Sequence, residues 1–208
     1  MMNNMALLKK KYIVLSDDSS DDASKSENKE SSTQIGSNQI YFYDDVTRTS
    51  IYNLNRNLEI VSKNLLYVSI NYNLIQVPPI QLFISSEGGE IFSAFSAVDR
   101  IKANKVPVHS YVEGIAASAA TLLSVVASKR FIRRNSFMLI HQVSSSVWGN
   151  FQQIKEETNN LELLMKYIKN IYMTHTKFNE SDLDKLLKQD LYLDAQECLK
   201  FGLVDEII

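Results

Sequence analysis

The chain has 208 residues, of which 45% are hydrophobic, and its 22 lysines and arginines against 24 aspartates and glutamates give a net charge of −2 at pH 7. A chain of this length is expected to form one domain with a substantial core, and its near balance of charge excludes a strongly basic nucleic-acid-binding protein. The single cysteine, Cys198, rules out an internal disulfide and favours a reducing compartment, which we expect to be the cytoplasm.

Residues 1–38 are predicted to form a flexible, acidic and polar segment ahead of a folded domain at 39–208. The part from 16 to 38 contains mainly Ser, Asp, Glu, Lys and Asn, with almost nothing apolar. Such a composition cannot bury enough surface to offset the entropy lost on ordering. The basic run near the start follows the short apolar patch, which is the wrong order for a secretory signal. No run reaches the roughly 18 apolar residues of a membrane helix, so we expect no membrane partner.

Beyond this segment, strand and helix patterns alternate three times. This alternation favours right-handed βαβ units and an α/β fold, without internal repeats. The pattern predicts a strand at 39–46, a helix at about 49–71, a buried strand at 79–86, a helix at 88–104, a strand at 106–112, a helix at 115–128 and a pair of short strands within 130–141.

A long helix is predicted from Gly149 to about Lys177. Ile154, Leu161 and Ile168 are spaced seven residues apart, with further apolar residues between them, as in the seam of a coiled coil. The seam fits two interpretations: a helix packed on its own domain, or a helix that meets another subunit. The pattern alone does not choose between them.

Several motifs are missing from the sequence. It contains no G-x-x-x-x-G-K-[ST] phosphate loop, no G-x-G-x-x-G dinucleotide motif, no H-E-x-x-H and no cysteine–histidine cluster. We therefore expect no metal and no cofactor in this chain, and we do not expect it to hydrolyse ATP itself.

The stretch YVEGIAASAATLL, residues 111–123, places Ser118 among small residues at the expected start of a helix. Small neighbours allow close packing, and they also give a substrate backbone access to the serine oxygen. The positive end of the helix dipole would favour a nucleophile there, and the Ala119 amide could help to hold an oxyanion. In SSEGGE, Gly88 follows a strand end and offers a backbone N–H that suits an oxyanion site, although a tight turn would also require glycine.

His141 ends the apolar strand FMLIH, where a sheet presents catalytic groups. An imidazole there can take the proton of a serine and return it to a leaving amine. His109 lies inside a strand and is expected to be structural, whereas His175 lies near a helix end, where a capping role suffices. A triad also needs a carboxylate, and spacing alone does not choose among Asp182, Asp184, Asp190, Asp194 and Asp205.

From about Ile40 to Ile208 the sequence resembles the proteolytic subunit of the Clp protease, a family of serine peptidases. The resemblance is carried by LFISSEGGEIFSA, YVEGIAASAATLL, RFIRRNSFMLIHQ and DLYLDAQECLKFGLVDEI, which occur in the family's order with similar gaps. It implies the fold that this family shares with crotonases. It also implies the site: Ser118 as nucleophile, His141 as general base, Asp190 as carboxylate, and Gly88 and Ala119 as the oxyanion donors.

The resemblance further implies an assembly. Members of the family form homo-oligomeric seven-membered rings, usually two stacked face to face, and a separate AAA+ unfoldase uses ATP to feed them unfolded proteins. The handle would be residues 143–177, with 143–149 as the strand that lines the substrate. The helix of the handle would meet the opposite ring. The resemblance therefore favours the interpretation of its seam as a contact with another subunit.

The sequence departs from the family pattern at Glu87 and Val143, where proline is usual, and at Gln189, where an arginine that pairs between rings is common. These departures indicate a divergent member, for which a viral origin (host cytoplasm) or an organellar one (stroma or matrix) are alternatives. Two other functions stay open: an inactive structural subunit of a mixed ring, and a crotonase-type acyl-CoA enzyme. The presence of serine, histidine and aspartate together favours the peptidase.

Overall fold

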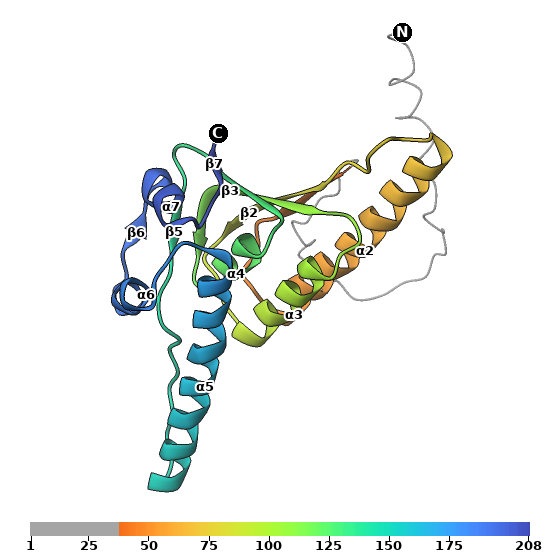
Figure 1. Ribbon diagram of the computed structural model, residues 1–208. Helices are drawn as coiled ribbons and strands as arrows, with labels where there is room; N and C mark the ends of the chain where they lie inside the picture. Colours follow the sequence, from red (N-terminus) through yellow and green to blue (C-terminus); the bar gives the residue numbers. More distant parts are fainter. Residues whose placement is uncertain (1–37) are drawn as a thin grey trace, which may run out of the picture. The chain divides into compact units, whose positions relative to one another are not determined.

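The computed structural model describes residues 38–208, so the segment predicted at 1–38 lies outside the described residues apart from its last position. The described part is an α/β structure, as expected (Figure 1). Its strands are β1 (Gln39–Phe42), β2 (Ile80–Ser86), β3 (Val108–Ala117), β4 (Lys129–Ile132), β5 (Phe137–Leu139), β6 (Tyr192–Leu193) and β7 (Glu206–Ile207). Its helices are α2 (Arg48–Asn71), α3 (Ile91–Lys102), α4 (Ala119–Val125), α5 (Phe151–His175), α6 (Glu180–Leu187) and α7 (Ala195–Phe201).

The sheet runs in the order β1-β2-β3-β4-β7, and every pairing along this path is parallel. On the edge that faces away from β2, strand β3 pairs first with β4 and then with β5. Its residues 109–112 pair with β4, its residues 115–117 pair with β5, and Gly114, with a φ of +71°, lies between the two stretches. Strand β6 is antiparallel to β5. The carboxyl ends of β3 and β5 therefore lie side by side.

Helix α2 forms where the sequence predicts it. Thr47 and Ser50 form a capping box, in which each side-chain oxygen accepts the backbone N–H of the other residue. The buried positions Ile51, Leu54 and Leu58 recur every three or four residues and place one face of the helix in the core. The helix packs against β1, β2 and α3, and α3 in turn packs against α4.

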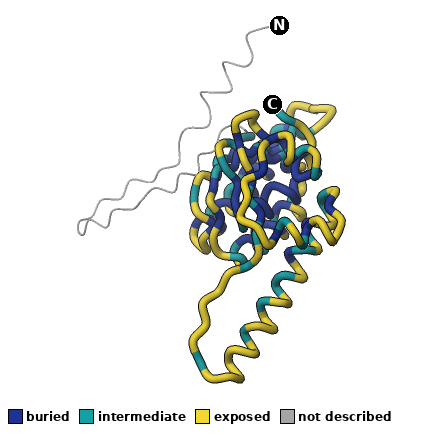
Figure 2. Tube along the Cα trace, turned by 90° about the vertical axis from the view of Figure 1, so that its left-hand side faces the viewer, coloured by how far each residue is buried: buried dark blue, intermediate teal, exposed yellow. Residues whose placement is uncertain are grey.

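Helix α5 protrudes from the body of the fold (Figure 1). A capping box between Asn150 and Gln153 starts this helix of 25 residues. Its buried residues are confined to its last third, at Ile168 and Tyr172, and the burial map shows the rest exposed or intermediate (Figure 2). Packing on the body therefore holds only the C-terminal part of α5, which we call its base.

The segment 143–149 is extended and runs alongside α5, from the body of the fold to the outer end where the helix begins (Figure 1). The Val143 N–H donates to Met165 Sδ at 3.2 Å, and Ser145 Oγ donates to Glu157 at 2.9 Å. The segment has no strand partner within the described chain. None of the described residues thus pairs with its edge.

Several details differ from the sequence-based expectation. The helix predicted at 115–128 begins only at Ala119, because residues 115–117 continue β3 by pairing with β5. The strand predicted at 39–46 ends at Phe42, and Val46 forms an isolated bridge to Gly89 instead. The two short strands within 130–141 do form, but each pairs with β3 and not with the other.

Candidate active site

Ser118 stands in a strained turn between β3 and α4. Its φ of +51° and ψ of −125° lie outside the conformations that a residue with a Cβ normally adopts. Its N–H donates to the carbonyl oxygen of Leu139, the last residue of β5, at 2.8 Å. Backbone strain of this kind clusters at functional sites, since the surrounding structure must hold it. Although the G-x-S-x-G motif is absent, the serine occupies a sharp strand-to-helix turn of the same kind.

Gly88 packs directly against this turn. A Cβ at Gly88 would lie 2.7 Å from the carbonyl oxygen of Ala117 and 2.8 Å from Ser118 Cβ, and its φ is +101°. Only glycine fits such a conformation at such a distance. Glycine is thus needed here both for the turn and for close approach to the serine. The two interpretations of the SSEGGE motif, a tight turn and an oxyanion site, are therefore compatible.

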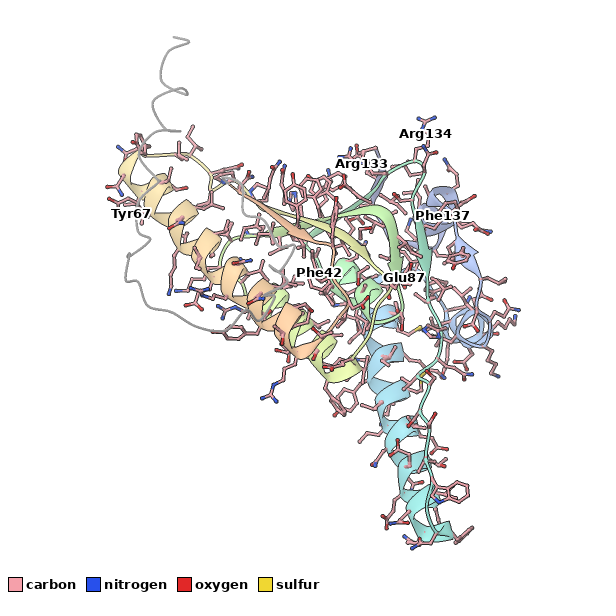
Figure 3. The ribbon with its side chains drawn as sticks, turned by 180° about the vertical axis from the view of Figure 1, so that it is seen from behind. Phe42, Tyr67, Glu87, Arg133, Arg134 and Phe137 are labelled. Carbon is pink, nitrogen blue, oxygen red and sulfur yellow. The ribbon has the colours of Figure 1, made fainter. Side chains whose placement is uncertain are left out.

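The two predicted oxyanion donors differ in their present partners. The Gly88 N–H donates to Ser86 Oγ at 3.2 Å, a long bond that it would have to exchange for a substrate oxygen. Ala119 is the first residue of α4, and its N–H is among those that find no acceptor within the helix. The Ala119 N–H is therefore the readier of the two to receive negative charge. Glu87, whose charge neighbours the glycine turn, is exposed at the end of β2 (Figure 3).

His141 lies two residues beyond the end of β5, beside the end of β3. The parallel pairing of Ala117 with Leu139 brings Ser118 and His141 to one edge of the sheet. Both line a pocket of about 240 Å³ between the sheet, α4 and the base of α5. The remaining walls of the pocket come mainly from Gly89, Glu90, Ile91, Leu122, Val143, Ile168 and Tyr172.

Asp190 is the carboxylate beside His141. Asp190 Oδ1 lies 3.5 Å from His141 Nδ1, and the two side chains are 81% and 28% exposed respectively. The loop that carries Asp190 is held close by the pairing of β6 with β5 and by a bond of 2.9 Å from the Gln142 N–H to the Leu187 carbonyl oxygen. The separation exceeds a hydrogen bond, and catalytic contacts are often this loose without a substrate.

The other candidate carboxylates have other partners. Asp182 bonds to the α6 cap residue Asn179, Asp184 pairs with Lys169, Asp194 caps α7, and Asp205 pairs with Arg130. Each therefore stabilises a local structure. The geometry thus separates Asp190 from the four residues that spacing left equivalent.

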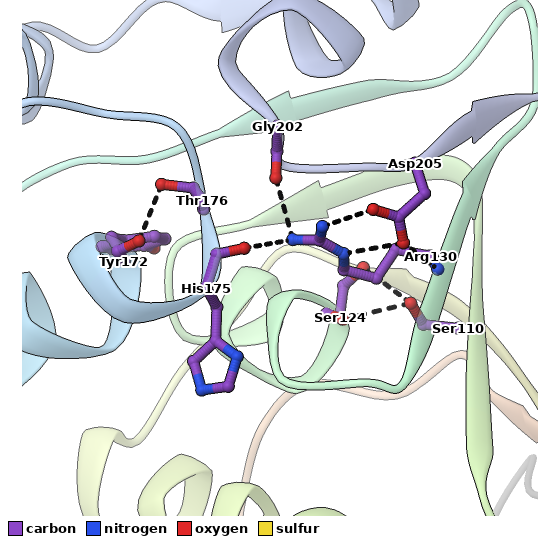
Figure 4. A network of polar contacts seen from close by, with 8 residues as sticks. All are labelled: Ser110, Ser124, Arg130, Tyr172, His175, Thr176, Gly202 and Asp205. Carbon is purple, nitrogen blue, oxygen red and sulfur yellow. Dashed lines mark hydrogen bonds and ion pairs between the residues drawn. The ribbon is translucent and has the colours of Figure 1, made fainter.

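The remaining histidines lie outside the pocket. Partial burial and the nearby charge of Lys129 lower the pKa of His109, which lies on β3. His175 is the last residue of α5, and the Arg130 guanidinium donates to its backbone carbonyl oxygen (Figure 4). Cys198 is fully buried, and this burial raises the pKa of its thiol to about 12, which makes it a poor nucleophile.

Within residues 38–208, no group of three or more histidine, cysteine, aspartate or glutamate side chains is arranged to hold a metal ion. In the same residues, no helix combines the length and the apolar character needed to cross a membrane.

Two residues of α5 line the pocket; sequence reasoning named Ile168 only as part of the seam and did not name Tyr172. Ile168 is only 5% exposed and packs in the core of its own domain, so this end of the seam is not available to another subunit. Tyr172, one turn further along, is 2% exposed and lines the same pocket. The spacing of four residues between them was the available signal, because residues i and i+4 share a helix face.

Comparison with known proteins places these observations in a family. A family model described as Clp protease matches residues 37–208. The ATP-dependent Clp protease proteolytic subunit 2 of Treponema denticola is 31% identical over 153 residues, which cover 73% of this chain and 76% of that protein. The proteolytic subunit 1 of Protochlamydia amoebophila is 34% identical over 134 residues, or 62% of this chain and 65% of that protein.

A solved structure leads in the same direction. A mutant of ClpP1 from Listeria monocytogenes superimposes with a TM-score of 0.71 over 83% of this chain and 91% of its own, at 23% sequence identity. At this identity the likeness establishes the shared fold.

Proposed function

The chain belongs to the Clp protease family, and we propose that it is a serine endopeptidase subunit that cuts unfolded proteins into short peptides. One observation carries the proposal: Ser118, in a strained turn, and His141 line the same pocket, at the joined ends of two parallel strands. The Ala119 N–H at the start of α4 and the glycine turn beside it would hold the oxyanion that forms when the serine attacks.

The proposed reaction proceeds through an acyl-enzyme. Ser118 Oγ attacks the scissile carbonyl carbon while His141 takes its proton, and the carbonyl oxygen becomes an oxyanion near the N–H groups of Ala119 and Gly88. The C–N bond then breaks, and His141 passes its proton to the leaving amine. Water repeats the sequence on the ester and releases the acid product and free Ser118. Asp190 stabilises the imidazolium that forms in each half.

We further propose that the chain works as a homo-oligomer in a seven-membered ring, served by a separate AAA+ unfoldase that consumes ATP, while this chain needs no cofactor. The compartment that fits this proposal is the cytoplasm. The apolar side chains at the outer part of the handle support an interface there, since Trp148 is 100%, Phe151 80% and Ile154 43% exposed. Exposed aromatic and aliphatic groups of this kind mark contact surfaces.

The second candidate is an inactive structural subunit of a mixed ring. Two observations favour it: the Gly88 N–H is already bonded to Ser86, and Asp190 is largely in solvent. Both geometries would have to tighten for efficient catalysis.

Labelling with a fluorophosphonate probe separates the two candidates. Intact-mass analysis is expected to show one adduct on the wild type and none on Ser118→Ala, with peptide hydrolysis lower by about 10⁴-fold or more in the variant. Ser144→Ala is the matched control, because Ser144 is an exposed serine that lines the same pocket. It should still be labelled once. An assembled wild type that takes no adduct would favour the structural subunit.

A further inference from the structure

Two buried hydroxyl groups connect the turn of the nucleophile to the base of the handle. Thr121 lies in the first turn of α4, and its Oγ1 lies 2.6 Å from the carbonyl oxygen of Ser118. The same Oγ1 lies 2.5 Å from the phenolic oxygen of Tyr172, on α5. Thr121 is 0% and Tyr172 is 2% exposed, so water does not compete for either hydroxyl.

The direction of both hydrogen bonds follows from the number of protons. A threonine hydroxyl carries one proton, and a carbonyl oxygen can only accept. Thr121 must therefore donate to Ser118, and Tyr172 must donate to Thr121. Burial raises the pKa of Tyr172, which keeps its phenol protonated. The result is a relay that runs from α5 through Thr121 to the serine.

The group at the end of the relay orients the oxyanion donor. The carbonyl of Ser118 and the N–H of Ala119 belong to the same planar trans peptide, so they point in opposite directions and rotate together. Fixing the carbonyl thereby fixes the direction of the Ala119 N–H. A fixed direction matters here, because the φ of +51° at Ser118 is a strained state that persists only where neighbours hold it.

The other end of the relay is firmly attached. Thr176 Oγ1 donates to the Tyr172 carbonyl oxygen at 2.7 Å, and Arg130 Nη1 donates to the carbonyl oxygens of His175 and Gly202 (Figure 4). Arg130 is fixed in turn by Asp205. Tyr172 therefore projects from the part of α5 that is fastened to the sheet and to α7, and not from its exposed outer part.

We propose that Tyr172 is a positioning residue which, through Thr121, aims the Ala119 N–H into the oxyanion site. This inference rests on the proposed serine peptidase function. According to this proposal, the packing of the base of α5 against α4 contributes to the stabilisation of the transition state. An oxyanion donor acts on the transition state more than on the bound substrate, so the effect belongs in kcat and not in KM.

Tyr172→Phe tests the proposal by removing the hydroxyl while keeping the ring that packs beside the pocket. Loss of a whole oxyanion donor costs about 10²–10³-fold, and a misaimed one is expected to cost about tenfold in kcat, with KM within about twofold. Thr121→Val should cause a similar loss. The double variant should be no slower than the slower single variant, because both substitutions break one relay.

Ser110→Ala is the matched control. Ser110 is also fully buried, and its hydroxyl holds the opposite end of α4 through Ser124. A kcat of Tyr172→Phe within about twofold of wild type would overturn the proposal. An equal loss in Ser110→Ala, at an equal fall in the thermal midpoint, would reduce the effect to general destabilisation and overturn it as well.

Hydrogen exchange keeps the relay testable should the wild type be inactive, a result that would count against the proposed function only. One hydrogen bond of about 1 kcal/mol corresponds to about fivefold in exchange. We expect the amides of 117–122 to exchange faster by about that factor in Tyr172→Phe and to be unchanged in Ser110→Ala. Unchanged exchange in Tyr172→Phe would overturn the relay whatever the activity.

Discussion

The serine side and the carboxylate side of the candidate site are built differently. The turn at Ser118 is fixed by a backbone bond to β5, by the close packing of Gly88 and by the hydroxyl of Thr121. Asp190, in contrast, lies in the loop between α6 and β6, is 81% exposed and lies 3.5 Å from His141. The fold therefore holds Ser118 and the turn around it rigidly, while the approach of a carboxylate to His141 depends on a loop in solvent.

The two sides are therefore expected to differ in how much each interaction contributes to catalysis. Ion pairs in solvent contribute about 0–1 kcal/mol because water screens them. The close packing around the strained turn at Ser118 is not weakened by water in this way. Substitutions on the serine side should therefore cost much more than substitutions on the carboxylate side.

The largest effect is expected from Gly88→Ala. The added methyl group would meet Ala117 O and Ser118 Cβ at under 3 Å, in a backbone conformation that alanine avoids. We expect peptide hydrolysis to fall by about 10³-fold, the scale of a lost oxyanion donor. Gly114→Ala is the control, since Gly114 also has a positive φ, of +71°, but its added methyl would approach Ser85 instead. Wild-type hydrolysis in Gly88→Ala would disprove the tight packing of the turn.

Ile168→Ala should have the next largest effect, on stability. It empties a buried site under the pocket, and such truncations cost about 2–5 kcal/mol. Urea denaturation measures this loss. Ile75→Ala, the same change at a residue that is 100% exposed, should stay within about 0.5 kcal/mol. Equal values for the two variants would mean that the floor of the pocket is not part of the core.

Asp190→Asn tests the carboxylate side. We expect kcat to fall only about 10–10²-fold, well short of the roughly 10⁴-fold seen where the triad carboxylate is buried. Asp182→Asn serves as the control, because Asp182 is another exposed carboxylate nearby, in α6. A loss near 10⁴-fold in Asp190→Asn would show that the two sides are equally fixed and would erase the contrast.

The smallest effect concerns the ion pair between Arg130 and Asp205, beside the base of α5. Partial burial would raise the pKa of Asp205, but its hydrogen bonds and charge interaction with Arg130 outweigh burial and hold that pKa below its usual value. A depressed pKa stabilises the fold above the ordinary aspartate pKa, and this contribution is lost as pH falls through the folded-state pKa. Asp205→Asn should lower the thermal midpoint by about 2–4 °C at pH 7.

The difference between Asp205→Asn and the wild type should shrink towards pH 3 and below. Calorimetry over this range measures it. A difference that is constant with pH would mean that the carboxylate charge contributes nothing to the anchoring of α5 and α7.

The sequence pointed to His141 because the apolar strand FMLIH ends in it, and to Ser118 because it stands among small residues; the structure places both in one pocket. The sequence could not choose Asp190 by spacing, since that choice depends on the pairing of β5 with β6 and on the bond from Gln142 to Leu187. Only the family resemblance indicated Asp190. The catalytic roles of Ser118, His141 and Asp190 all stay predictions.

The sequence also misplaced the start of α4. Small residues at 115–117 suit a helix as well as a strand, and the ladder to β5 decided for the strand. The contact between Thr121 and Tyr172 joins residues 51 positions apart and has no signature in either stretch. Such contacts follow only from the tertiary packing.

Strand β5 has three residues, and its neighbours hold it through the main chain on both sides. Main-chain hydrogen bonds do not depend on which side chains a strand carries. Mutations can therefore accumulate along β3 and β5 over long evolutionary times, provided that residue size is kept, while the serine and the histidine stay in register. A short strand between two ladders thus makes the site tolerant of sequence drift.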